Sequence, residues 1–161
     1  MKPWAMFLGS LFVAIAGAVL WEQKAAQNLV GQIAGEAVAA HMKLKPLEVK
    51  TNSIDGVKEF FAELGFAPAA SKVLVTQFQV SEQALQGGRY ASLNGVPVAQ
   101  LRYRASQNDL STLYQAVYSH VRFGEMPKIQ QGEQPRVIVI SGLSVSMWVE
   151  NGLLLVLVKG V

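Results

Sequence analysis

The stretch from Trp4 to Trp21 constrains this chain most, because it holds no charged residue and only one clearly polar side chain, Ser10. As a helix it would extend about 27 Å, close to the roughly 30 Å hydrocarbon thickness of a bilayer. Trp4 and Trp21 stand at its two ends, where indole rings favour the membrane interfaces. We therefore predict a transmembrane anchor over residues 4–21.

The charges that flank this stretch predict its orientation. Lys2 and the amino terminus precede it, whereas Glu22 and Lys24 nearly cancel after it. The positive-inside rule then places residues 1–3 in the cytoplasm as a short tail and everything after Trp21 outside. The alternative is a cleaved signal peptide, since residues 14–16 and 16–18 are small-residue triplets typical of cleavage sites. Either alternative exports the rest of the chain, and the length of the apolar run favours retention.

Within the predicted anchor, small residues recur at spacings of four, three and one, which places them on one helix face: Ser10, Ala14, Gly17 and Ala18. Such a face lets a second transmembrane helix approach closely. Alanine and glycine are also common in transmembrane helices for other reasons, so the face has an ordinary compositional explanation as well.

Several classes of chemistry find little support in the composition. There is no cysteine, which excludes disulfides, thiolate nucleophiles and cysteine-bound metals. The net charge is +3 with both signs interspersed, so no basic patch suggests a nucleic-acid partner. His41 and His120 lack the spacing to carboxylates that a metal site needs, and no serine stands in a nucleophile motif. We expect a non-enzymatic protein without metal or cofactor.

Residues 22–45 are expected to form a juxtamembrane helix that Pro46 ends, with its apolar residues near one face: Leu29, Val30, Ile33, Ala37, Val38 and His41. A domain over residues 46–161 follows. It should begin with a strand at 47–51 and a helix that Ser53 caps and Gly65 ends. The β-rich run 72–80 is predicted as a strand.

The remainder predicts an antiparallel sheet. Asn94-Gly95 and Asn151-Gly152 are typical of two-residue hairpin turns, in which both residues have positive φ. Gly87-Gly88 suggests a β-bulge, and Pro97 should lie at a strand start or an edge. Further strands are expected at 89–93, 96–104, 110–118, 136–140, 144–150 and 153–158, the last of them central and buried, with a loop at 122–135. The predicted fold class is α+β, with one helix packed on a mostly antiparallel sheet.

Aromatic residues in the strand-like segments most simply pack in the core or across strands. They also supply a candidate partner surface, because exposed aromatic and arginine side chains dominate protein interfaces. The candidate residues are Arg89, Tyr90, Tyr103 and Trp148.

An ordered series of short segments is similar to the extracytoplasmic half of bacterial membrane-bound anti-sigma factors, the transmembrane transcriptional regulators. The series spans roughly residues 29–158 and comprises Glu36–His41, Val57–Phe61, Leu64–Pro68, Leu85–Tyr90, Gly95–Tyr103, Trp148 and Asn151–Leu153. Those regulators carry a cytoplasmic sigma-binding domain, often with a His/Cys zinc motif. Here only three residues precede the anchor and cysteine is absent, so the resemblance implies the exported fold and not sigma binding by this chain.

Two functions follow as expectations. The first is a single-pass protein of the bacterial inner membrane whose periplasmic domain binds a protein partner in a regulatory or interaction role. The second is a small accessory or assembly subunit of a larger membrane complex, such as a respiratory one. Both require the membrane and a protein partner, and neither requires nucleic acid.

Overall fold

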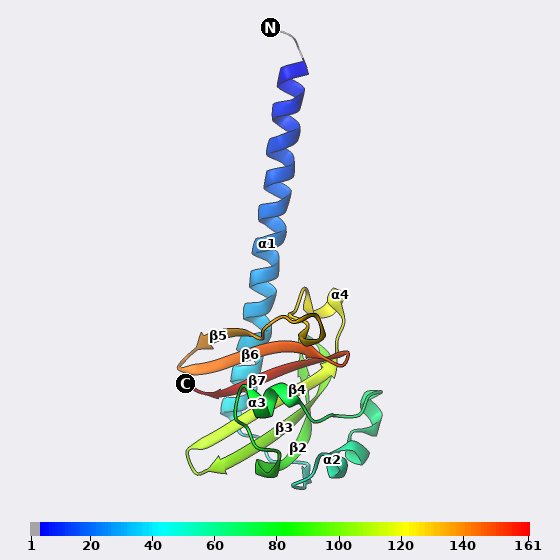
Figure 1. The fold of residues 1–161 in the computed structure, drawn as a ribbon, viewed down its shortest axis with the longest axis vertical. Coiled ribbons are helices and arrows are strands. Elements are labelled where there is room, and N and C mark those ends of the chain that lie inside the picture. The colour runs from blue at the N-terminus through cyan, green and yellow to red at the C-terminus, as the bar shows by residue number, and fades with distance from the viewer. Residues whose placement is uncertain (1–3) are drawn as a thin grey trace.

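The computed structural model describes residues 4–161, with side chains from Ile15 onward. One long helix, α1 (Trp4–Lys43), leads into a domain built on a seven-stranded sheet (Figure 1). All pairs of named strands are antiparallel, and the other helices are short. The α+β class and the antiparallel sheet are therefore confirmed.

The helix α1 is continuous over 40 residues, where the sequence predicted an anchor and a separate juxtamembrane helix. Residues 22–28 contain neither proline nor glycine and consist mostly of good helix formers, so nothing ends the helix there. Its first half projects beyond the sheet, whereas its second half packs on the domain (Figure 1). The predicted tail, residues 1–3, lies outside the described residues.

The second half of α1 belongs to the core of the domain. Most of the residues predicted for its apolar face are buried, namely Val30, Ile33, Ala37, Val38 and His41, and Leu29 packs beside them. Their spacing of three and four residues turns one stripe toward the sheet. The hydrophobic core of the domain therefore includes α1 residues from Leu29 onward.

Within the described residues, no helix is both long enough and apolar enough to cross a membrane.

The sheet has the order β1-β2-β3-β4-β7-β6-β5, so the chain adds strands to both sides of a central β4–β7 pair. The strands are β1 (Val49–Lys50), β2 (Leu85–Leu93), β3 (Val96–Ser106), β4 (Asp109–Val117), β5 (Arg136–Ile140), β6 (Leu143–Glu150) and β7 (Leu153–Gly160). As predicted, β7 is an interior strand with residues 154–158 buried. Of the predicted 47–51 strand, Val49 and Lys50 form the ladder with β2. The N–H groups of Glu48 and Thr51 donate to the Gly88 and Gln86 carbonyls at 2.9 and 3.3 Å.

Both faces of the sheet are covered. On one face α1 packs against side chains that include Tyr114, Met147 and Val156. On the other, α2 (Ile54–Phe60) and α3 (Lys72–Thr76) cover Leu101, Trp148 and Leu157. Alternate residues of β7 enter opposite clusters, as the period of two in a strand requires.

Both predicted hairpin turns are present. Asn94 and Gly95 have φ of 49° and 72°, and Asn151 and Gly152 have φ of 51° and 78°, the left-handed pair that a type I′ turn needs. A third such turn, Ser141-Gly142, joins β5 to β6 and carries no asparagine signal. Pro97 is the second residue of β3, at the strand start as expected.

The predicted bulge is also present, since the β2–β3 register shifts between Leu85 and Gly87. Gly88 follows it beneath the ring of Phe61, where an added Cβ would lie 2.9 Å from a ring carbon. Ser53 caps α2 as predicted, accepting a hydrogen bond from Gly56 N–H at 3.1 Å. The three-residue 3₁₀ helix η1 (Ala62–Leu64) continues to Gly65, which ends it with φ of 73°.

The strand predicted at residues 72–80 is wrong, because Lys72–Thr76 forms α3. Ser71 caps this helix by accepting from Leu74 N–H at 3.1 Å. The buried carboxylate of Glu150 accepts from the Ser71 hydroxyl and from Lys72 N–H. This tertiary anchor overrides the β propensity of the valine-rich segment.

The predicted loop at 122–135 contains helical turns: the end of α4 (His120–Phe123) and η3 (Ile129–Gln131). A further 3₁₀ turn, η2 (Glu82–Ala84), precedes β2. Gly132 has φ of 78°, so it too adopts a left-handed conformation.

Candidate functional site

A groove of about 740 Å³ lies between the second half of α1 and the start of the sheet. Its lining includes Glu36, Ala39, Ala40 and Lys43 from α1. These residues are three, one and three apart, so they share one helix face, beside the stripe that packs on the sheet. We name this hollow the α1–β2 groove.

The opposite wall comes from β2 and its turn, with Tyr90, Ala91, Ser92 and Gly95. Small side chains therefore line the middle of the groove, Ala39 and Ala40 on the helix and Ala91 on the strand, with Ser92 at the strand edge beside Ala91. Space is left because α1 crosses the sheet at this point without a large side chain to fill the gap. A partner side chain has room to enter here.

This part of β2 is an open sheet edge, because β1 pairs only with Gly87 and Gly88. Leu93 and Val96 flank the two-residue Asn94-Gly95 turn and form a hydrogen-bonded pair. Because such pairs alternate along an antiparallel ladder, the N–H and C=O groups of Tyr90 and Ser92 point away from β3. Tyr90 N–H donates a hydrogen bond to the Glu48 carboxylate at 2.7 Å, and Asn94 N–H donates to the Glu36 carboxylate at 2.6 Å. In the described part of the chain, Ser92 N–H and the Tyr90 and Ser92 carbonyls have no hydrogen-bond partner.

Positive charge gathers at one end of the groove, where Lys43, Lys45 and Arg89 line it. Arg89 donates to the Pro46 carbonyl at 2.7 Å and lies 3.5 Å from the Glu48 carboxylate. Both acidic groups near the groove, Glu36 and Glu48, already accept from backbone N–H groups of the β2 segment. Lys43 and Lys45 make no ion pair among the described residues, so their ammonium groups are the cations with which a partner can pair at this end.

A second layer of cations lies beneath this end. Arg102 donates to the Lys45 carbonyl at 2.7 Å. Partial burial lowers the pKa of Arg102, and the neighbouring Arg104 and Arg89 lower it further. The three guanidinium groups therefore repel one another.

The predicted partner surface is not assembled as one patch. Arg89 and Tyr90 do lie beside the groove, although the Tyr90 hydroxyl donates to the Phe60 carbonyl at 2.7 Å. Tyr103 and Trp148 are buried on the other face of the sheet. The Trp148 ring stacks on Phe78 with centroids 5.3 Å apart, which makes it a core residue and removes it from any exposed surface.

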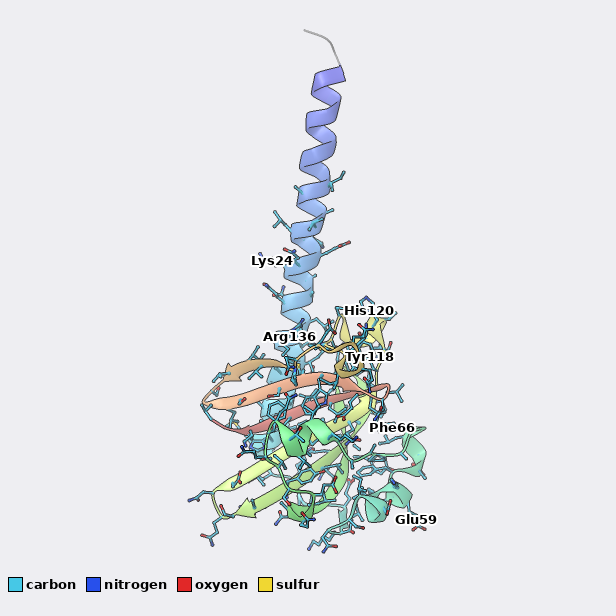
Figure 2. All side chains as sticks on the ribbon, in the orientation of Figure 1. Lys24, Glu59, Phe66, Tyr118, His120 and Arg136 are labelled. Atoms are coloured by element: carbon cyan, nitrogen blue, oxygen red, sulfur yellow. The ribbon has the colours of Figure 1, made fainter. Side chains whose placement is uncertain are left out.

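The predicted helix-packing face lies at the projecting end of α1. Gly17 and Ala18 are exposed there, and the side chains of Ser10 and Ala14 lie outside the described ones. Figure 2 shows Lys24 on the same projecting part of the helix. A Cβ added at Gly17 would meet no described atom within 4 Å.

The two histidines occupy unrelated positions. His41 is buried, and its Nδ1 lies 2.8 Å from the Thr112 hydroxyl. His120 is exposed on α4 (Figure 2), 3.2 Å from the Glu125 carboxylate. Among the described residues, no three metal-ligating side chains of the His, Cys, Asp and Glu types come together.

Most of the residues that line the groove were not predicted as site residues from the sequence, namely Glu36, Ala39, Ala40, Lys43, Lys45 and Ser92. One signal was available: the run from Glu36 to Lys43 places alanines between two charges on a face that the core does not use. The contribution of Ser92 depends on strand order and on the shortness of β1, which no local pattern reveals.

Comparisons with protein-family models, with curated proteins and with solved structures found no match for this chain.

Proposed function

We propose that this chain is a membrane-tethered interaction protein whose domain binds a protein partner in the α1–β2 groove. The observation that carries the proposal is the combination of an open sheet edge and an adjoining groove lined by small residues. Unpaired edge groups are a ready template for another chain, and natural proteins usually cover them. The resemblance to the exported half of anti-sigma regulators supports the same role.

The tether in this proposal is residues 4–21, retained in the bacterial inner membrane with the domain in the periplasm. Its support is the uncharged run and the two flanking tryptophans. Because α1 is continuous, Glu36 would stand about 22 Å beyond Trp21 along the helix axis. One wall of the groove would thus belong to the same helix as the anchor.

Protease treatment of spheroplasts tests the tether. A tag at the C-terminus should be digested while the N-terminal segment stays in the membrane fraction. A tag that is protected until the membrane is permeabilised would contradict the orientation. Recovery of a soluble domain beginning near Gly17 would show a cleaved signal peptide.

Co-purification of the tagged full chain in mild detergent tests the binding function. Ala39→Trp should fill the groove without disturbing the core, because Ala39 is exposed. Ala26→Trp is the matched control on an exposed position of the same helix outside the groove. A partner should be recovered with the parent and with Ala26→Trp, and lost with Ala39→Trp; equal recovery with both variants would refute the groove as the site.

The same experiment separates the second candidate, an accessory subunit of a membrane complex, for which the open Gly17 and Ala18 face of α1 gives independent support. An accessory subunit would be recovered in fixed stoichiometry with several membrane proteins. Gly17→Leu would release it, whereas Ala39→Trp would not.

A further inference from the structure

The inference that follows rests on the proposed function and concerns how the partner is recognised. Beyond β1, the N–H groups of Tyr90 in β2 and of Asn94 in the following turn point away from β3, and they donate to the carboxylates of Glu48 and Glu36, respectively. Ser92 lies midway between them, and both its N–H and its carbonyl are free among the described residues. One residue of an extended segment can satisfy both groups with two backbone hydrogen bonds.

The side-chain directions follow from this register. Ala91 packs toward α1, and Ser92 points to the opposite face of the sheet. A partner residue opposite Ser92 would share that direction, so its two neighbours would point into the groove. One neighbour would then lie near Glu36 and Gly95, and the other near the cationic end at Lys43 and Lys45.

The charges decide the chemistry of that second neighbour. Lys43 and Lys45 are exposed and make no ion pair in the described part of the chain. Complementary charges across an interface select partners and speed their association. An acidic side chain fits this end of the groove, and a basic one would be repelled.

We infer that the α1–β2 groove binds an extended acidic segment of a protein partner, which pairs with Ser92 as an added strand and places a carboxylate among Lys43, Lys45 and Arg89. This mode takes its affinity from backbone hydrogen bonds and its specificity from the groove.

Two synthetic peptide pools supply the probe. Each pool holds octapeptides with random sequence. The acidic pool is made from Val, Thr, Ser and Glu, and the basic pool is made from Val, Thr, Ser and Lys. Binding to the full chain in detergent is measured by fluorescence anisotropy at two salt concentrations. We expect the acidic pool to bind at least about tenfold more tightly than the basic pool, with the difference shrinking at high salt.

Matched variants then test the strand pairing. Ser92→Pro removes the outward N–H without breaking a β2–β3 hydrogen bond, and proline is tolerated at such edge positions. Ser92→Pro should weaken the binding of the acidic pool about tenfold, whereas Ser92→Ala should leave that binding unchanged. The double variant Lys43→Glu with Lys45→Glu should reverse the preference between pools, and Lys24→Glu on the projecting part of α1 should not.

The outcomes are distinguishable from failure of the proposed function. Equal binding of the two pools, or equal binding by Ser92→Pro and Ser92→Ala, would overturn the acidic-strand inference. If Ala39→Trp still releases the natural partner in that case, the groove function stands with a different mode of recognition. If Ser92→Pro lowers the melting temperature, the lysine variants on exposed positions decide the question alone.

Discussion

Replacing Glu150 should show that one buried carboxylate holds α3 on the sheet. Its oxygens accept from the Ser71 hydroxyl, from Lys72 N–H at 3.2 Å and from the Trp148 indole N–H at 3.1 Å. Ser71 and Trp148 are both almost fully buried. Glu150→Ala would therefore leave donors without partners in a dry site.

The structure sets the magnitude. A hydrogen bond to a charged group contributes about 1.5–3 kcal/mol, and three such bonds that share one acceptor do not add fully. We expect Glu150→Ala to lower the free energy of unfolding by about 3–5 kcal/mol, a large part of the roughly 5–15 kcal/mol typical of a domain. Glu150→Gln should cost less, because its amide oxygen still accepts.

Urea unfolding of the full chain in detergent, followed by near-UV circular dichroism, measures the change. Hydrogen exchange should also show that the amides of 72–76 lose protection before those of β7. Glu63→Ala is the control, since Glu63 is exposed and should shift stability by less than about 0.5 kcal/mol. A Glu150→Ala variant as stable as the control would refute the assignment of α3 to this anchor.

Three shorter predictions follow from the described contacts. Gly95→Val forces a β-branched residue to φ of 72° and should cost about 1–3 kcal/mol in thermal unfolding, whereas Gly160→Val, with open space around it, should cost much less. Gly88→Val should destabilise by about 2 kcal/mol or more in the same assay, because its Cβ would lie 2.9 Å from the Phe61 ring; a stable variant would contradict that packing. Burial, and then Arg102, lower the pKa of His41 below 6.5, so the unfolded chain takes up a proton first and stability should fall as pH drops below 6.5; His41→Gln should remove that part of the slope between pH 7.5 and 5.5 in urea titrations.

Local signals explain what the sequence could predict of the fold. The turns at Asn94-Gly95 and Asn151-Gly152 were predictable because positive φ at two successive positions demands those residue types. The cap at Ser53 and the buried run of β7 were equally local. The predicted loop at 122–135 gave no sign that Gly132 ends a 3₁₀ helix with φ of 78°.

The features that sequence could not supply depend on distant contacts. Lys72–Thr76 is helical because Glu150, far along the chain, accepts its first N–H. Trp148 was predicted to belong to a partner surface, yet the order of the strands places its ring against Phe78 in the core. The groove itself requires that α1 cross β2 and that β1 begin only at Val49, which leaves residues 89–93 of β2 unpaired on that side; no local pattern reveals either feature.

Photo-cross-linking in living cells tests the central claim most directly. A benzophenone amino acid is placed at Ala39 within the groove and, in a parallel strain, at Ala26 on the same helix outside it. The account predicts a discrete protein adduct from position 39 that disappears when Ser92→Pro is added, and no such adduct from position 26. An adduct from position 26 alone, or one from position 39 that persists with Ser92→Pro, would contradict partner binding through the β2 edge of the groove.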